Sequence, residues 1–208
     1  MQAQAPSKSN LKEACVQAAH EFIAEKGIEN LSMRDVARRL EVSHQAPYRH
    51  YPSKDHLLAA VIARCFRDFA NFLDAQTHFE SPEEDLAAMG QQYVSYAIGH
   101  PLEYRLMFGT TWPDAAEDSE LIRDSQHAFN VLRKVLERMH GTGKAAREKV
   151  DLDAMFIWSN MHGLVTLMHS HVMHKLQLAP KVEDKVAQHV FDMIGAAMKS
   201  GSGKKDTK

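Results

Sequence analysis

The sequence has little cysteine, no long apolar run and few strand-forming patterns. Only Cys15 and Cys65 occur among 208 residues, and we expect them to be reduced, buried thiols of an intracellular protein. No stretch of about 18 consecutive apolar residues is present, so no segment is expected to span a membrane. The polar N-terminal segment lacks the pattern of a secretory signal. These absences predict a soluble, cytoplasmic protein.

The motifs of common enzyme classes are also absent. The chain contains no Walker-type phosphate loop, no Gly-x-Ser-x-Gly nucleophile turn and no His-Glu-x-x-His zinc pair. A net charge of −2 excludes a polycation, so any basic surface must be local. We therefore predict that the protein is not an enzyme and that it requires no cofactor.

What the chain does contain is a dense series of helix start and stop patterns, together with 44% hydrophobic residues. Ser32 followed by Asp35, and Ser81 followed by Pro82, are typical N-terminal caps, and Gly27 is typical of a helix end. These patterns predict an all-α fold of about nine helices. The helices are predicted over about residues 10–26, 33–40, 44–51, 53–75, 82–99, 101–108, 115–140, 145–177 and 181–199.

Residues 31–58 carry the most specific pattern. Two short predicted helices, about 33–40 and 44–51, are separated by a turn at Glu41 and Val42, which is the layout of a helix-turn-helix DNA-binding unit. Between Ser32 and Lys54, five Lys or Arg residues stand against two acids, which gives this segment a charge of +3. A positive charge of this size predicts a few contacts to DNA phosphates.

The helix register assigns the residues of this head to two sides. The side chains expected to point inward are Phe22, Leu31, Val36, Ala37, Leu40, Val42 and the ring of Tyr48. Among the outward residues, which include Arg38 and Arg39, Gln45 can contact adenine, His44 can contact base edges and Ala46 can touch a thymine methyl group. The predicted DNA contacts are Ser32, Arg34, Ser43, His44, Gln45, Ala46, Tyr48, Arg49, His50 and Lys54.

This stretch, over about residues 10–60, resembles the TetR family of bacterial transcriptional regulators. The matching residues are Gly27, Ser32, Arg34, Val36-Ala37, Val42-Ser43, Tyr48, His50-Tyr51, Ser53-Lys54 and Leu57-Leu58. The resemblance implies a three-helix DNA-binding head, a helical ligand-binding body and a homodimer that usually represses transcription. Two departures prevent transfer of base specificity from relatives: Glu41 replaces a common glycine, and Gln45-Ala46-Pro47-Tyr48 replaces a common Gly-Thr-Leu-Tyr run.

The second half is similar to the TetR subgroup with a Trp-His-Gly (WHG) C-terminal domain, through residues 104–109 and 158–163. We expect four segments. They are a flexible N-terminal arm (1–9), a helix-turn-helix DNA-binding domain (10–56), a helical effector-binding and dimerisation domain (57–199) and a disordered tail (200–208).

The predicted helix over about 145–177 is apolar on several sides, so it should have neighbours on several sides. In the family that the chain resembles, this helix and the last one form the dimer interface. The predicted interface residues are Val165, Met168, Val172, Val186, Val190 and Ile194.

Aromatic and methionine side chains of the middle helices are either plain core or the lining of an effector pocket. We predict that a small apolar or aromatic effector binds there and tilts the helix over 53–75. The protein would then release a palindromic operator. The candidate pocket residues are Phe66, Phe69, Tyr93, Tyr96, Tyr104, Met107, Phe108, Trp112, Trp158, Met161 and His162.

Two alternatives involve no sequence-specific DNA binding. One is a metal-sensing module, because His169, His171 and His174 follow His162 closely. Only His171 and His174 have ligand-like helical spacing, and no acid or cysteine is in register with them. The other is a helical protein-interaction module.

Overall fold

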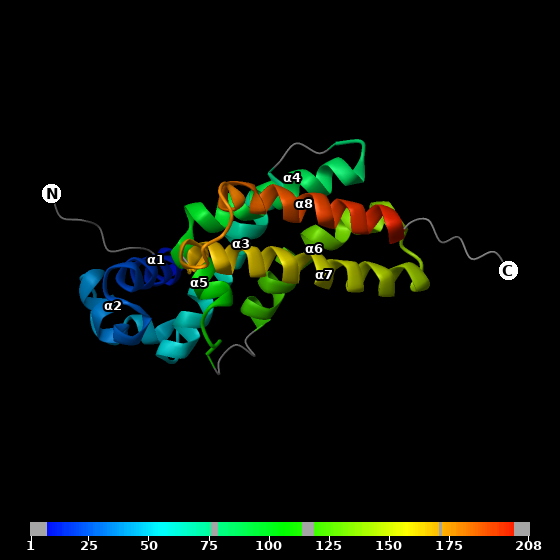
Figure 1. Cartoon of the computed structure of the whole chain (residues 1–208). Coiled ribbons are helices and arrows are strands. Elements are labelled where there is room, and N and C mark those ends of the chain that lie inside the picture. Colours follow the sequence, from blue (N-terminus) through cyan, green and yellow to red (C-terminus); the bar gives the residue numbers. More distant parts are fainter. Residues whose placement is uncertain (1–7, 76–78, 114–118, 171, 202–208) are drawn as a thin grey trace. The chain divides into compact units, whose positions relative to one another are not determined.

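The computed structural model describes residues 8–75, 79–113, 119–170 and 172–201, and every regular element in these ranges is helical (Figure 1). The α-helices are α1 (Lys8–Lys26), α2 (Met33–Arg39), α3 (Lys54–Asp74), α4 (Pro82–Gly99), α5 (Pro101–Phe108), α6 (Ser119–His140), α7 (Lys144–His169) and α8 (Val182–Gly201). Short 3₁₀ helices are η1 (Ile28–Asn30), η2 (Pro47–Arg49) and η4 (Met173–Lys175). The all-α prediction is confirmed. None of the described helices has the length and apolar character needed to cross a membrane.

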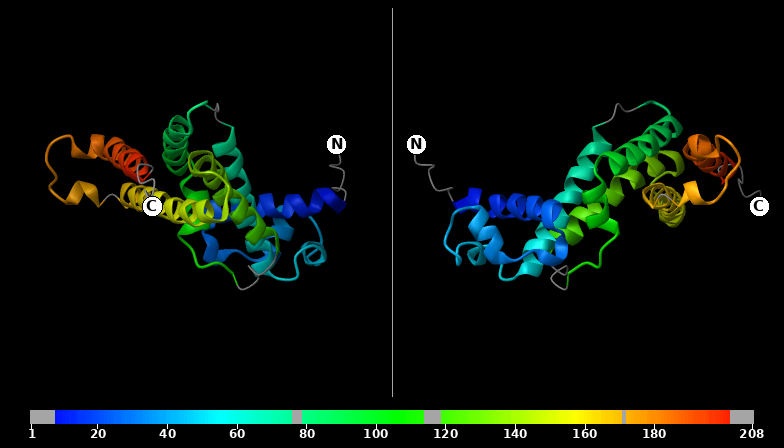
Figure 2. Two further views of the ribbon diagram at one scale, coloured as in Figure 1. Left: turned by 90° about the vertical axis from the view of Figure 1, so that its right-hand side faces the viewer. Right: turned by 60° about the vertical axis from the view of Figure 1, so that its left-hand side comes forward.

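The chain divides into two compact units. The first comprises residues up to Asp68 together with Leu102–Gln126, and the second comprises Phe69–Pro101 together with residues from His127 onward. Within the first unit, α1 contacts α2 and η2, and α2 contacts η2. Within the second, α7 contacts both α4 and α8, and Figure 2 shows α7 and α8 running beside each other.

The predicted helix starts are confirmed where side chains cap them. The Ser32 hydroxyl oxygen accepts the backbone N–H of Asp35 at 3.2 Å and donates its own proton to the Asp35 carboxylate at 2.5 Å. Ser81 accepts the backbone N–H of Glu84 at 3.3 Å. Gly27 follows α1 with φ 85° and ψ 158°, a region open almost only to glycine. These local features position α2 and α4.

Two predicted helices differ in the structure. The segment predicted as a helix over 44–51 is a turn followed by the single 3₁₀ turn η2, which is why eight α-helices rather than nine occur in the described residues. The helix predicted over about 145–177 ends at His169. Lys8 and Ser9, predicted to belong to the flexible arm, lie in α1. The rest of the arm (1–7), residues 115–118 of a predicted helix, and 202–208 of the tail lie outside the described residues.

Each unit has its own apolar core. In the first, Ile23, Val36 and Leu57 are 0–1% exposed, and in the second Leu136 and Val150 are fully buried. The second unit also buries Asp85, which accepts the backbone N–H of Phe79 at 2.6 Å and pairs with Arg138. Because an unpaired buried carboxylate is costly, this pair ties the start of α4 to the end of α6. Sequence spacing did not indicate this contact.

Candidate nucleic-acid interface

The turn after α2 sets the direction of the candidate DNA-contacting segment. The Val42 N–H donates to the Ala37 carbonyl at 3.1 Å and the Glu41 N–H donates to the Arg38 carbonyl at 3.2 Å. This pair of bonds is a Schellman motif, whose residue after the C-cap adopts positive φ. Glu41 holds that position with φ 54°, where a glycine would be free of steric cost. The turn therefore has a strained backbone at Glu41.

Pro47 explains why the next segment is not an α-helix. Proline has no N–H, so it cannot bond the Ser43 carbonyl, and Ala46 donates to that carbonyl instead at 2.9 Å. Arg49 then donates to Ala46 at 3.3 Å and His50 to Pro47 at 3.0 Å, each in the tighter 3₁₀ spacing. The result is a compact loop from Ser43 to His50 in place of the predicted helix.

This loop exposes most, but not all, of the residues predicted to face outward. Ser43, His44, Gln45 and Arg49 are exposed. Ala46 is only 8% exposed, so its predicted outward position is wrong: its methyl group packs inward beside the buried Pro47. The polar side chains therefore form the accessible edge, which we call the reading edge and define as the exposed residues of Ser43–Arg49.

The inward aromatic ring of this region is Tyr51 rather than Tyr48. Tyr48 is 40% exposed, against the prediction that its ring is buried, whereas Tyr51 is 5% exposed. The Tyr51 hydroxyl donates to the Lys12 carbonyl at 3.2 Å, and burial raises its pKa well above the ordinary value, so it stays a donor. Tyr51 thus anchors the end of the loop to α1, a role that the sequence analysis missed.

Ion pairs within the head neutralise two of its cationic side chains. Arg38 pairs with Asp35, and Arg39 pairs with Glu25 and, at 3.4 Å, with Glu21. The hydrogen bond from Arg39 is the main reason that the pKa of Glu25 lies below its usual value. Within the described residues, the remaining cations between residues 32 and 54 have no carboxylate partner; they are Arg34, Arg49 and Lys54. Three unpaired cations therefore remain for an anionic partner.

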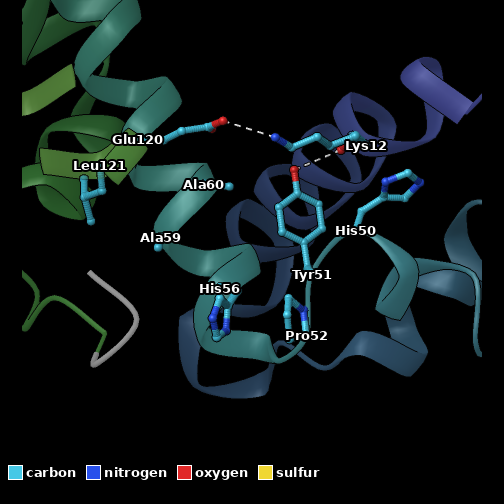
Figure 3. Close-up of a pocket in the computed structure, with 9 residues that line it drawn as sticks. All are labelled: Lys12, His50, Tyr51, Pro52, His56, Ala59, Ala60, Glu120 and Leu121. Carbon is cyan, nitrogen blue, oxygen red and sulfur yellow. Dashed lines mark hydrogen bonds and ion pairs between the residues drawn. The ribbon is translucent and has the colours of Figure 1, made fainter. Parts of the chain in front are cut away.

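A small cavity of about 80 Å³ lies beside this loop in the first unit (Figure 3). Lys12 of α1 pairs with Glu120 of α6 at 3.1 Å, and both line the cavity together with His50, Tyr51 and other residues. Its volume is well below the roughly 300–1,000 Å³ of drug-sized ligand pockets. The cavity therefore does not correspond to the effector pocket expected from the sequence.

Residues predicted to line an effector pocket form aromatic clusters within each unit. In the first unit, the Phe66 ring lies 5.5 Å from Phe108 and 5.7 Å from Trp112, and Tyr104 lies 5.0 Å from Phe108. Met107 is buried in the same unit.

The other two clusters belong to the second unit. Phe69 lies 5.5 Å from Tyr93 and 5.0 Å from Tyr96, and Trp158 lies 6.1 Å from His162. Met161 is buried, and burial lowers the pKa of His162 below its ordinary value, which favours the neutral imidazole. Such close ring contacts suit a packed core as well as a pocket lining.

The histidines behind the metal-sensing alternative have other partners. His169 donates to the Ala97 carbonyl at 3.1 Å, and His174 pairs with Glu183 at 2.5 Å. His171 lies outside the described residues. In the part of the chain that the structure describes, no three side chains of His, Cys, Asp or Glu are grouped so that they could hold a metal ion.

The predicted dimer residues are less exposed than expected. Val165 is fully buried and Ile194 is 6% exposed within the single chain, so each offers little surface to a partner. Met168, Val172, Val186 and Val190 are half-buried. The large apolar side chains that α7 and α8 do expose are Leu152, Met155, Phe156, Leu167, Val182 and Met193. We call these six residues the apolar face.

Comparison with known proteins assigns this architecture to a family. Residues 16–61 match the family described as bacterial regulatory proteins, tetR family, and residues 86–200 match the tetracyclin repressor-like C-terminal domain. The chain belongs to the TetR family of bacterial regulatory proteins. The first match contains α2 and the reading edge, and the second contains most of α4 and all of α5 to α7. The likeness to the WHG subgroup stays a prediction, since the matched C-terminal domain carries the tetracyclin repressor-like description.

Sequence relatives of this TetR-family chain are regulators. An HTH-type transcriptional repressor of Mycobacterium tuberculosis is 32% identical over 111 residues, covering 53% of this chain and 57% of the relative. An HTH-type transcriptional regulator of Staphylococcus aureus is 35% identical over 88 residues, covering 42% of this chain and 44% of the relative. An HTH-type transcriptional regulator of Mycobacterium bovis is 24% identical over 110 residues, covering 51% and 47%. The chain spans about half the length of the curated relatives it matches.

Solved structures share the fold over nearly the whole chain. A protein of unknown function from Rhodococcus sp. RHA1 superposes with TM-score 0.68 at 24% identity, covering 90% of this chain and 94% of that one. A fatty acid degradation regulator from Bacillus halodurans superposes with TM-score 0.60 at 16% identity, covering 93% and 96%. At these identities the likeness establishes the fold alone.

Proposed function

We propose that this TetR-family chain is a DNA-binding transcriptional regulator that responds to a small molecule. It binds a palindromic operator as a homodimer in the cytoplasm, represses transcription and carries out no catalysis. The observation that carries the proposal is the reading edge: a short loop, anchored by Tyr51, that exposes Gln45, Arg49 and their neighbours within a TetR-type head. Polar and cationic side chains held on a rigid scaffold are what base edges and phosphates require.

The residues of the head divide between base and phosphate contacts. Gln45 has the amide that pairs with adenine in the major groove, and Ser43 and His44 lie beside it on the exposed edge. Arg34, Tyr48, Arg49, His50 and Lys54 serve the phosphate backbone. The Ser32 side chain caps α2, so its contribution to DNA binding is to position that helix.

The apolar face supports a homodimer. Leu152 is 64% exposed, Leu167 46% and Met193 58%, so these large apolar side chains are accessible to a partner. A second copy of the chain would bury them, and two reading edges one DNA turn apart would contact a palindrome. The half-buried residues Met168, Val172, Val186 and Val190 then lie at the border of that interface.

The proposed effector is a small apolar or aromatic molecule bound among the aromatic clusters. The chain has only two tryptophans, and each belongs to a different cluster: Trp112 contacts Phe66, and Trp158 contacts Phe129 and His162. Fluorescence titration of Trp112→Phe and Trp158→Phe against a ligand library therefore reports which cluster receives the ligand. If no compound both alters the fluorescence and weakens DNA binding, the effector part of the proposal fails.

DNA binding is tested by gel shift of the full chain on the DNA upstream of its own gene. We expect Arg49→Ala to weaken binding to every sequence alike, and Gln45→Ala to relax preference at one base pair. Arg147→Ala, an exposed cation of α7, is the matched control and should leave binding unchanged. Equal behaviour of the Arg49 and Arg147 variants would contradict the proposed interface.

A further inference from the structure

The segment between Ser32 and Lys54 contains few unpaired cations. Of the five Lys and Arg residues between positions 32 and 54, two are already paired with carboxylates, which leaves Arg34, Arg49 and Lys54. The same segment contains two histidines, His44 and His50. Imidazole is the side chain that changes charge between about pH 5 and pH 8. Protonation of both histidines would raise the number of unpaired cations from three to five.

We propose that His44 and His50 are proton-dependent contacts to operator DNA, so that acidification strengthens operator binding. The inference rests on the proposed DNA-binding function and adds a form of regulation to it. An imidazolium beside a phosphate is favoured by the DNA's negative charge, so binding takes up protons. By linkage, affinity rises as pH falls from about 8 to about 6, because binding of the imidazolium form takes up protons.

The surroundings of His44 leave it open to DNA. It is exposed at the start of the reading edge, where the Tyr48 ring lies 5.7 Å from it in a tilted contact. Glu41, the nearest acid in the chain, is also exposed and lies just before the edge. One exposed carboxylate in water attracts an imidazolium only weakly, whereas a DNA duplex presents a phosphate about every 1.7 Å of its axis.

His50 is half-buried at the other end of the loop. The groups that share its cavity are Lys12 and Glu120, which pair with each other, the Tyr51 hydroxyl, and His56, whose ring bonds the Ser53 hydroxyl at 2.8 Å. Figure 3 shows the His50 ring pointing away from Tyr51. Lys12 and Glu120 carry opposite charges, so together they add no net formal charge beside His50.

The test is fluorescence anisotropy of the full chain on the duplex that it selects from random DNA, at about pH 8 and about pH 6 and over a series of salt concentrations. We expect the affinity to rise by about tenfold at the lower pH. A dimer would gain several exposed charge pairs with DNA, and their combined free energy corresponds to a change of this size. The slope of log affinity against log salt should steepen by up to about 0.9 for each histidine that neutralises a phosphate.

Variants assign the effect to these two residues. His44→Gln and His50→Gln should each reduce the gain on acidification, and the double variant should abolish it. His44→Arg carries a permanent charge, so it should tighten binding at about pH 8 and flatten the pH dependence. His127→Gln, at an exposed histidine of the second unit, is the matched control and should keep the full gain.

The outcomes separate this inference from the proposed function. Absence of sequence-specific binding at either pH overturns the proposed function itself. Binding with equal affinity and equal salt slope at both pH values overturns the histidine proposal alone. A full pH gain in the His44→Gln/His50→Gln double variant also overturns it, because other groups would then supply the protons.

Discussion

The reading edge and the apolar face are both exposed, but their chemistry is opposite. The first gathers polar and cationic side chains such as Gln45 and Arg49 on a short loop, whereas the second gathers Leu152, Phe156 and Met193 on two long helices. Each surface lacks something within the single chain: negative charge in one case and apolar cover in the other. The comparison is the basis for the proposal of one partner for each surface, DNA for the edge and a second copy for the face.

Placing charge on the apolar face should have the largest effect. We expect Phe156→Asp combined with Leu167→Asp to weaken self-association by at least about a hundredfold, because two carboxylates would be buried in an apolar interface. Both side chains are exposed in the single chain (42% and 46%), so the fold itself should tolerate the change. Sedimentation equilibrium measures the association constant.

The control for this experiment is Ile98→Asp on α4, since Ile98 is also exposed, at 54%, but lies outside the apolar face. It should leave association unchanged. A double variant that associates as well as the Ile98 variant would show that the face has no role in assembly.

The ion pairs of the two units sharpen the comparison further. Asp85 in the second unit is fully buried, whereas Lys12 and Glu120 in the first expose 49% and 41% of their side chains. We expect Asp85→Ala to lower the free energy of unfolding by about 2–4 kcal/mol, because its partner Arg138 and the Phe79 N–H lose their acceptor. Glu120→Ala should cost less than about 1 kcal/mol. Urea denaturation measures both, and equal losses would contradict this reasoning.

A change at Gly27 should weaken the head alone. Its φ of 85° is unfavourable for a side chain, and an added Cβ would lie 2.9 Å from a carboxylate oxygen of Glu29. That oxygen can move, so we attribute the expected loss of about 1–3 kcal/mol for Gly27→Ala chiefly to the backbone. Thermal unfolding should detect it, while self-association should be unaffected. An unchanged melting temperature would mean that the turn after α1 relaxes freely.

The smallest expected effect is a gain at Glu41. Glu41→Gly places glycine at a position with positive φ and removes a negative charge beside the reading edge. Because glycine adopts this φ without strain, the variant should be more stable by about 0.5–1 kcal/mol. Glu41→Gln removes only the charge, so it should tighten DNA binding without the gain in stability. If the glutamine variant stabilises as much as the glycine variant, backbone strain is not the cause.

The sequence predicted the features that depend on a few neighbouring residues. The caps at Ser32 and Ser81 were identifiable because each bond joins residues three apart, and Gly27 because its backbone requirement is local. The loop at Ser43–His50 was predicted as a helix because it follows the turn at Glu41 and Val42 in a helix-turn-helix layout, and this layout does not show the effect of the missing N–H of Pro47. The end of α7 at His169 has no proline or glycine directly after it, so the sequence carried no local pattern that predicts it.

The sides of α7 could not be assigned from sequence for a different reason. A helix that is apolar on several sides has more than one candidate contact stripe, and spacing alone does not say which stripe meets its own core. Val165 was assigned to the partner and is buried in its own chain, whereas Phe156 was not assigned and is exposed. For the same reason, the aromatic residues predicted to line a pocket could be grouped into clusters only with the structure.

The central claim is that the reading edge contacts base pairs, once in each half of a dimer. Selection of bound duplexes from random DNA by the purified full chain at low salt tests it most directly. The account predicts a palindrome whose half-sites are centred about 10 base pairs, or a multiple of that, apart. Recovery of sequences with no common motif, or no retained DNA at all, would contradict it.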